Sequence, residues 1–115
     1  MDTSGRRIFS LQDAREQLPH VKAITAQAVQ AADRLVEKLR RMAADNPRRE
    51  ELEKSLNDVI ATWTSGLQEI GAEAKGLWLV DFDNGDGYYC WRYPEETISH
   101  YHGYTEGFGG RMKIV

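Results

Sequence analysis

The sequence lacks several features that would assign it to a specialised class of protein. It has one cysteine, Cys90, so no disulfide can form within the chain, and a lone thiol fits a reducing compartment. No segment approaches the roughly 20 consecutive apolar residues of a membrane-spanning helix, and the opening MDTSGRRIFS lacks the apolar core of a signal peptide. The formal net charge of -3 argues against a nucleic-acid-binding surface, which is normally basic. We therefore expect a cytoplasmic protein that binds neither nucleic acid nor a membrane.

Signatures of common enzyme classes are absent as well. The sequence contains no GxGxxG dinucleotide fingerprint, no phosphate-binding P-loop and no HExxH zinc-protease motif. The remaining candidate for catalysis is Cys90 as a nucleophile with His102 as its base. Tyr89 and Trp91 flank this cysteine, and an inert packed thiol is the competing interpretation because apolar surroundings raise the pKa of a thiol. The sequence therefore favours a protein that is not an enzyme.

The amino-terminal part of the chain has the pattern of amphipathic helices. Apolar residues recur there at steps of three and four, which places them along one stripe of a helix. Ser10 begins an approximate capping box with Asp13, three residues later. Pro19 then interrupts the pattern, since proline removes a helical hydrogen bond. We expect a short helix over 11–17, followed by a long helix that Pro19 opens.

A second long helix follows the turn DNPRREE. Asp45 or Asn46 is the expected cap, Pro47 suits the first turn, and Gly71 suits the end of the helix. Because the connection is short, the two long helices should form an antiparallel hairpin. Such a hairpin buries one stripe per helix and leaves apolar surface, so we expect a homodimer formed through the helices.

Beyond Gly76 the pattern changes to that of β-strands. LWLVDF and YYCWRY are rich in strand-forming residues, and DNGDG between them carries two hairpin-turn signals. TISHYHGY predicts a third short strand, and the glycine-rich GYTEGFGGR predicts a loop. The sequence therefore predicts a single α+β domain over 1–115. Its parts are a helical hairpin over about 10–73, and a three-stranded antiparallel β-meander with its tail over about 76–115.

The aspartates of DFDNGDG resemble part of a calcium-binding loop, which needs oxygen ligands at alternating positions. Counting from Asp81, the third alternating ligand position is Gly85, and the twelfth position, which should be a glutamate, is Arg92. Strands rather than helices flank the segment. We therefore interpret it as a hairpin turn, where Asn, Asp and Gly are favoured for their backbone angles.

Strand alternation predicts one polar face and one apolar face of the sheet. The polar side chains expected on one face are Asp81, Cys90, Arg92, His100 and His102. Trp78, Val80, Phe82, Tyr89 and Trp91 are expected on the other face. The aromatic face is the natural core, which would leave the polar face available for a ligand.

Three stretches together resemble a known family: FSLQDAREQLP, LVDFDN…YYCWRYPEETISHYH and GFGGR. They are similar to DUF2203, a bacterial family of unknown function, over nearly the whole chain, and the carboxy-terminal block is the specific part. The residues that match the family pattern are Asp81, Phe82, Cys90, Trp91, Arg92, Glu95 or Glu96, Ile98, His102, Gly107, Phe108 and Arg111. The resemblance implies no activity. It implies that these polar positions have a role.

These residues suggest two kinds of ligand site. His100 and His102, at alternate strand positions, can share a divalent transition metal, with Cys90 or a carboxylate as a further ligand. A small anion is the other possibility, because arginine grips carboxylates and phosphates at two points. The candidate ligand-binding residues are Asp81, Cys90, Arg92, Glu96, His102 and Arg111. The alternative is a structural protein in which Arg92 or Arg111 pairs with Asp81, Glu95 or Glu96.

Overall fold

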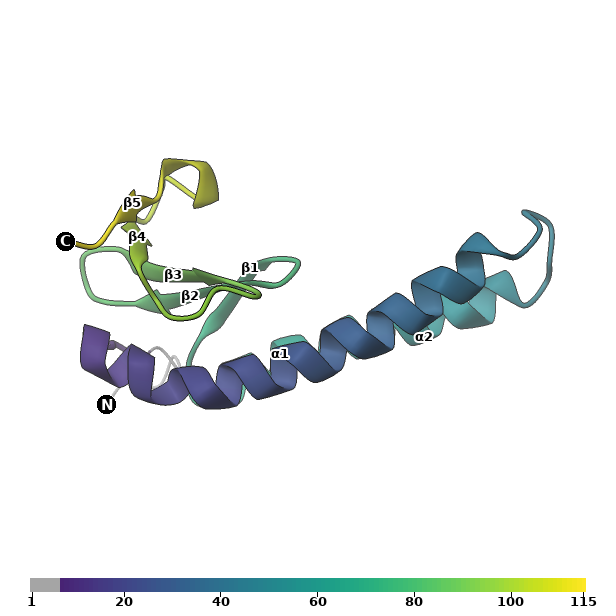
Figure 1. Cartoon of the computed structure of the whole chain (residues 1–115), viewed down its shortest axis with the longest axis horizontal. Helices are drawn as coiled ribbons and strands as arrows, with labels where there is room; N and C mark the ends of the chain where they lie inside the picture. The colour runs from purple at the N-terminus through teal and green to yellow at the C-terminus, as the bar shows by residue number, and fades with distance from the viewer. Residues whose placement is uncertain (1–6) are drawn as a thin grey trace.

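The structure, a computed structural model, describes residues 7–115, so most of the amino-terminal stretch examined for a signal peptide lies outside the described residues. Helices α1 (Leu11–Arg40) and α2 (Arg49–Ile70) form a long hairpin, and an antiparallel sheet lies against one end of it (Figure 1). The strands are β1 (Glu73–Gly76), β2 (Leu79–Asp83), β3 (Tyr88–Arg92), β4 (His100–His102) and β5 (Met112–Lys113). The predicted α+β class is confirmed, but the sheet has five strands rather than three.

Helix α1 begins where the sequence predicts, but it is one helix rather than two. Ser10 and Asp13 form the reciprocal capping box, with hydrogen bonds of 3.0 and 3.2 Å. The expected short helix over 11–17 is wrong, because the helix continues through Pro19 to Arg40. Pro19 is exposed, whereas Leu18 and Val21 beside it are buried. Packing of this apolar stripe therefore holds the helix together across the missing hydrogen bond.

Helix α2 starts slightly later than expected. Its cap is Arg48, which makes no capping hydrogen bond through its side chain. Asn46 instead accepts the Arg48 backbone N–H at 2.9 Å and shapes the loop. The predicted end is confirmed, since Gly71 caps the helix with φ of 95°, a left-handed conformation that glycine adopts without strain.

The sheet is an antiparallel meander in the order β1-β2-β3-β4-β5. Strand β1 was missed because EAKG has little strand propensity, and β5 because it has only two residues within a segment predicted to be loop. The strand predicted from LWLVDF begins only at Leu79. Before it, Leu77 and Trp78 make a turn in which Trp78 has φ of 63°. Strain at Trp78 is offset by its edge-to-face contact with Trp63, whose ring centroid lies 5.0 Å away.

The DNGDG segment forms the turn between β2 and β3, as predicted. The Asn84 backbone N–H donates to the Gly87 carbonyl, and the side chain of Asp83 accepts the Gly85 N–H at 2.9 Å. Gly85 has φ of 94°. These contacts are those of a tight hairpin loop, so the aspartates and glycines serve the turn.

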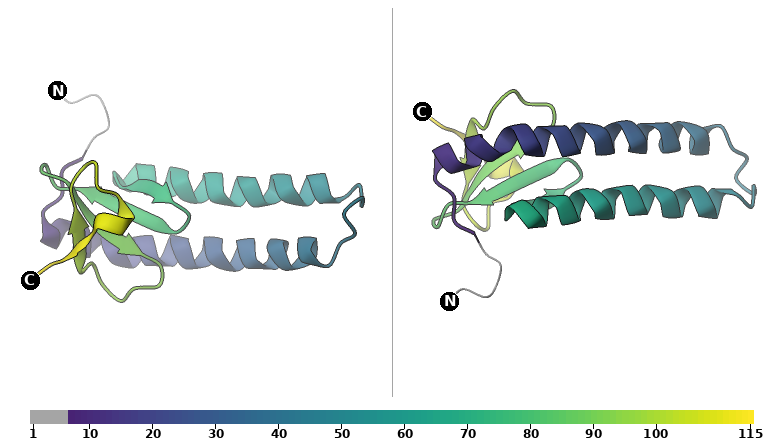
Figure 2. Two further views of the ribbon diagram at one scale, coloured as in Figure 1. Left: turned by 90° about the horizontal axis from the view of Figure 1, so that it is seen from above. Right: turned by 90° about the horizontal axis from the view of Figure 1, so that it is seen from below.

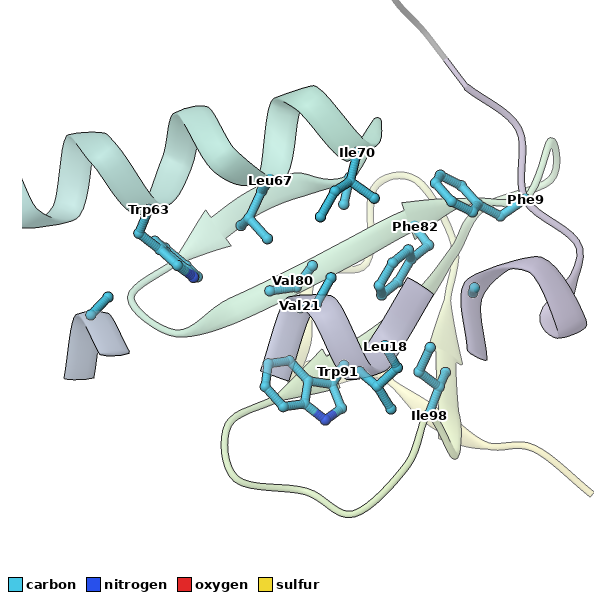
Figure 3. Packing of buried hydrophobic residues seen from close by; sticks show 13 residues of the cluster. Phe9, Leu18, Val21, Trp63, Leu67, Ile70, Val80, Phe82, Trp91 and Ile98 are labelled. Carbon is cyan, nitrogen blue, oxygen red and sulfur yellow. The ribbon is translucent and has the colours of Figure 1, made fainter. Parts of the chain in front are cut away.

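One face of the sheet packs on the helices and forms the core (Figure 3). Val80, Phe82 and Trp91 are fully buried there against Val21 of α1 and Leu67 of α2. Inside the helical pair, the Trp63 indole donates to the Thr25 hydroxyl at 2.8 Å. The aromatic face is therefore the core face, as predicted, and the polar residues that alternate with it point to the other side.

The helical hairpin extends well past the sheet, as the views from above and below show (Figure 2). The hairpin loop at residues 41–48 lies at the far end of this extension, while the sheet and the carboxy terminus lie at the other end (Figure 1). Among residues 7–115, no helix combines the length and apolar character needed to cross a membrane.

Candidate functional site

The outer face of the sheet brings polar side chains from three neighbouring strands together. In the ladder, Cys90 of β3 lies opposite Asp81 of β2 on one side and His100 of β4 on the other. His102 lies opposite Tyr88, two pairs further along. Because side chains two residues apart share a face, this register places Asp81, Cys90 and His102 on the same side of the sheet.

Asp81, Cys90 and His102 form a buried triad. Their candidate ligand atoms, a carboxylate oxygen, the thiol sulfur and an imidazole nitrogen, all lie within 4.8 Å of one another. The exposed fractions of the three residues are 2%, 1% and 4%. Burial of an acid, a thiol and an imidazole together is unusual unless each has a partner. The triad is the part of the predicted site that the structure assembles.

The backbone fixes the orientation of the His102 ring. Its Nδ1 lies 2.8 Å from the Gly103 carbonyl oxygen. A carbonyl can only accept, so Nδ1 carries a proton and donates it. In the neutral ring, Nε2 therefore presents a lone pair to the Asp81 carboxyl oxygen 2.9 Å away. Two electron-rich atoms face each other here, and a cation or a shared proton must lie between them.

Burial dominates the electrostatics of the triad. It raises the pKa of Asp81, although the nearby His102 opposes this shift. It also raises the pKa of the Cys90 thiol to about 12, with the negative charge of Asp81 as the next cause. At neutral pH the thiol is therefore protonated and a poor nucleophile. This argues against the Cys90–His102 catalytic pair as it stands.

A pocket of about 160 Å³ opens onto the triad. Its lining comes from the strands of the sheet and from the connection between β4 and β5, which lies on the side of the sheet away from the helices (Figure 1). The other residues lining it are Lys75, Leu79, Tyr88, Tyr104, Gly107 and Phe108. The volume suits a group of a few atoms rather than a large cofactor.

An ion pair fastens the tail beside the pocket. Arg111 grips the Glu95 carboxylate with both terminal nitrogens, at 2.6 and 3.1 Å. Its guanidinium also stacks 4.3 Å from the Phe108 ring centroid, and it lies near enough to Cys90 to influence the thiol. Burial alone would raise the pKa of Glu95, but hydrogen bonds from Arg111 and the Arg92 backbone outweigh it and lower that pKa. This pair matches the structural alternative considered for Arg111.

Besides Arg111, three further predicted residues lie outside the triad. Arg92 is exposed, with its guanidinium 5.7 Å from the Phe108 ring. The Glu96 side chain is exposed, and its backbone carbonyl accepts a hydrogen bond from Lys22 Nζ at 3.0 Å. His100 contacts Ser99 at 3.5 Å and does not join Asp81 and Cys90. The predicted pairing of His100 with His102 as metal ligands is therefore not what the geometry assembles.

Other residues of the pocket were not singled out from the sequence. Lys75 lies on β1, the strand that was not predicted, so no alternation pointed to it. Tyr104 lies in the segment expected to be loop and donates to Asp83 at 2.7 Å. Tyr88 lies on the same face as Cys90, so strand alternation could have identified it as a candidate site residue.

Comparison with known proteins agrees with the earlier resemblance. A family model described as "Uncharacterized conserved protein (DUF2203)" matches residues 7–114, nearly the whole chain. No curated protein and no solved structure matches. The chain belongs to the DUF2203 family.

Proposed function

We propose that this protein binds a divalent transition metal of the zinc type through Asp81, Cys90 and His102. The observation that carries the proposal is the orientation of His102. Its Nδ1 proton is committed to the Gly103 carbonyl, so Nε2 faces the Asp81 carboxyl with a lone pair. Metal-binding histidines in proteins are held in this way, with the second ring nitrogen donating to a backbone carbonyl or a carboxylate.

The three ligand types suit zinc. Thiolate, imidazole and carboxylate are its usual protein ligands, and three of them with one open position is typical of sites that bind an exogenous group. Ligand atoms around a tetrahedral zinc lie roughly 3.3–3.7 Å apart, given bond lengths of about 2.0–2.3 Å. The triad atoms, within 4.8 Å of one another, need to move by about 1 Å or less. The pocket beside the triad supplies room for a fourth ligand.

Metal binding would change the protonation of the site. The Cys90 thiol, with its pKa raised to about 12, must lose its proton to become a ligand. Any proton shared between Asp81 and His102 is displaced as well. Affinity should therefore rise steeply with pH, and binding should release protons.

Cobalt(II) titration tests the proposal, because a cobalt–thiolate bond gives charge-transfer absorption in the near ultraviolet. The expected result is one cobalt per chain, with the thiolate band lost in Cys90→Ser and binding lost in His102→Ala. His100→Ala is the matched control, since His100 is on the same strand but outside the triad. It should bind like the wild type. Absence of a thiolate band in the wild type, or equal loss in both histidine variants, would overturn the proposal.

A structural role is the second candidate, and a specific observation favours it. In residues 7–115, every buried polar side-chain atom has a hydrogen-bond partner, and Asp81 and His102 already contact each other at 2.9 Å. A proton between them would complete a buried network that fastens β4 to β2. In that case elemental analysis of protein purified without chelators finds no stoichiometric metal, while His102→Ala still lowers the melting temperature.

The anion-binding alternative rests on Arg111, whose guanidinium already holds Glu95 at two points. An anion at this residue would compete with that ion pair. An anion could instead bind at the triad itself, as the fourth ligand of the proposed metal, without displacing Glu95 from Arg111. A thermal-shift screen of small carboxylates and phosphate, with and without zinc, separates these routes.

A further inference from the structure

One long face of the helical hairpin has no cover within the described chain. The sheet packs on the opposite face, and the view from below shows both helices unobstructed along their length (Figure 2). A groove of about 660 Å³ runs between the helices, and its lining comes entirely from α1 and α2. Its floor is apolar, with Ile24, Ala28 and Ala31 on one side and Val59 and Gly66 on the other. This face is separate from the proposed metal site.

Small residues keep the groove open and the helices close. A side chain added at Gly66 would meet the end of the Ile24 side chain at 3.2 Å, so the backbone of α2 packs closely against this side chain of α1. Ala28 and Ala31 continue the small surface along α1. A hairpin of two helices has no third layer to fill such a groove, so apolar atoms stay in contact with water unless another helix covers them.

The two rims of the groove carry opposite charge. On α1, Arg34 and Lys38 continue the row of groove residues Gln27 and Ala31 by helical steps of three, four and seven. On α2, Asp58 and Glu69 line the groove itself. Glu51 extends that row one heptad before Asp58. Lys54 lies in the same row, between Glu51 and Asp58. The α1 rim is therefore basic, and the α2 rim is acidic in net charge.

The two charges on the basic rim have no ion-pair partner within the described part of the chain. Among residues 7–115, neither Arg34 nor Lys38 makes an ion pair, and both are exposed. Lys54 contacts Asp58 at 3.8 Å, but both side chains are largely exposed, so the acidic rim remains open to another cation. A groove with an apolar floor, one basic rim and one acidic rim is complementary to the same groove on a second copy rotated by half a turn.

We propose that a second copy of this chain covers the groove and forms a four-helix bundle, with α1 of each copy lying on α2 of the other. Trp63 lies beside Thr25, and the helices are antiparallel, so Glu51 and Asp58 lie level with the part of α1 that holds Arg34 and Lys38. A two-fold axis parallel to the hairpin keeps each residue at the same position along the hairpin in both copies. It brings the basic rim of one copy against the acidic rim of the other, with both hairpin loops at the same end. The opposite orientation would stack like charges and is disfavoured.

The oligomeric state and one pair of matched variants test the location of the interface. Sedimentation velocity should show a dimer for the wild type. Ala31→Arg, in the groove, should shift the chain to monomer. Asp33→Arg is the control, because this exposed residue is two positions further along and therefore on the opposite side of the same helix; it should leave the dimer intact. A monomeric wild type would overturn the proposal. So would a dimer that the two variants affect equally.

Charge exchange tests the arrangement without altering the floor. An acidic variant carries Arg34→Glu with Lys38→Glu, and a basic variant carries Glu51→Lys with Asp58→Lys. Each alone should dimerise on the order of tenfold or more weakly than the wild type, because like charges then face each other. An equimolar mixture should form a heterodimer, since every contact is again between opposite charges. Two variants that dimerise as tightly alone as together would contradict the pairing of α1 with α2.

Discussion

His102 Nε2 lies 2.9 Å from Asp81 Oδ2, although the two residues are 21 positions apart in the chain. The contact is buried on the face of the sheet that points away from the helices. Both side chains are buried, with exposed fractions of 4% and 2%. The contact therefore depends on what lies between two electron-rich atoms. A shared proton fits this separation of 2.9 Å, whereas the proposed metal would require the two atoms to move slightly apart.

The carboxyl of Asp81 should be replaceable by an amide more easily than by a methyl group. Asp81→Asn keeps a donor for His102 Nε2, whereas Asp81→Ala leaves a buried nitrogen without a partner. We expect Asp81→Ala to lose about 1–3 kcal/mol more stability than Asp81→Asn in chelator-treated protein. Urea unfolding of the two variants measures the difference. Equal losses would show that the Asp81–His102 contact contributes little to stability.

The Cys90 thiol should be nearly unreactive in the native, metal-free protein. Its exposed fraction is 1%, and burial raises its pKa from 9.0 to about 12. The thiolate population at neutral pH is then lower by roughly a thousandfold, and access is restricted as well. An aromatic disulfide reagent should label the native protein at least about a hundredfold more slowly than the protein in urea. Comparable rates in both states would mean that the site opens readily.

The Glu95–Arg111 ion pair should stabilise the protein only above acid pH. Arg111 and the Arg92 amide lower the pKa of Glu95 below its ordinary 4.5, despite burial, so the native state binds this proton less readily than the unfolded chain. The contribution is complete above the unfolded pKa and is lost as pH falls through the folded pKa. Glu95→Gln should cost about 1 kcal/mol at pH 7, a figure reduced for partial exposure. The gap from the wild type should close as the pH falls through the lowered, folded-state pKa of Glu95, and a gap that stays constant with pH would contradict this account.

The hydrogen bond between Trp63 and Thr25 should matter to the helical hairpin. Thr25 is fully buried, and its hydroxyl accepts the indole N–H at 2.8 Å. Thr25→Val leaves that N–H without an acceptor at almost unchanged volume, at a cost of about 1–3 kcal/mol. Thr25→Ser is the control, because it keeps the hydroxyl. Thermal unfolding should rank the valine variant below the serine variant, and the reverse order would refute the role of this bond.

Much of the fold follows from local patterns in the sequence. Helical periodicity and the capping box locate the start of α1, and the glycine at position 71 locates the end of α2. Strand alternation predicts that Cys90 and Asp81 share a face opposite Trp91. These features could be predicted because each depends on residues that are close together in the chain.

What could not be predicted depends on contacts between distant segments. Pro19 stays inside α1 because the helix packs on a sheet whose strands come 54 residues or more later in the chain, which local propensity ignores. Strand β1 exists because β2 offers it a partner. His102 rather than His100 joins the triad because of the register between β3 and β4 and the path of the backbone at Gly103. Alternation identifies a face, but only the register and the backbone select which residues on that face meet.

The triad can form only when the strands pair in the native register, so its presence reports that the sheet has folded correctly. Its three members come from three adjacent strands, and a slip of one residue in any of them would turn that member to the core face. A misregistered sheet could retain its strands, its helices and much of its circular dichroism. It could not retain the close approach of a thiol, an imidazole and a carboxyl. A spectroscopic probe at Cys90 would therefore separate natively paired chains from compact chains with shifted strands.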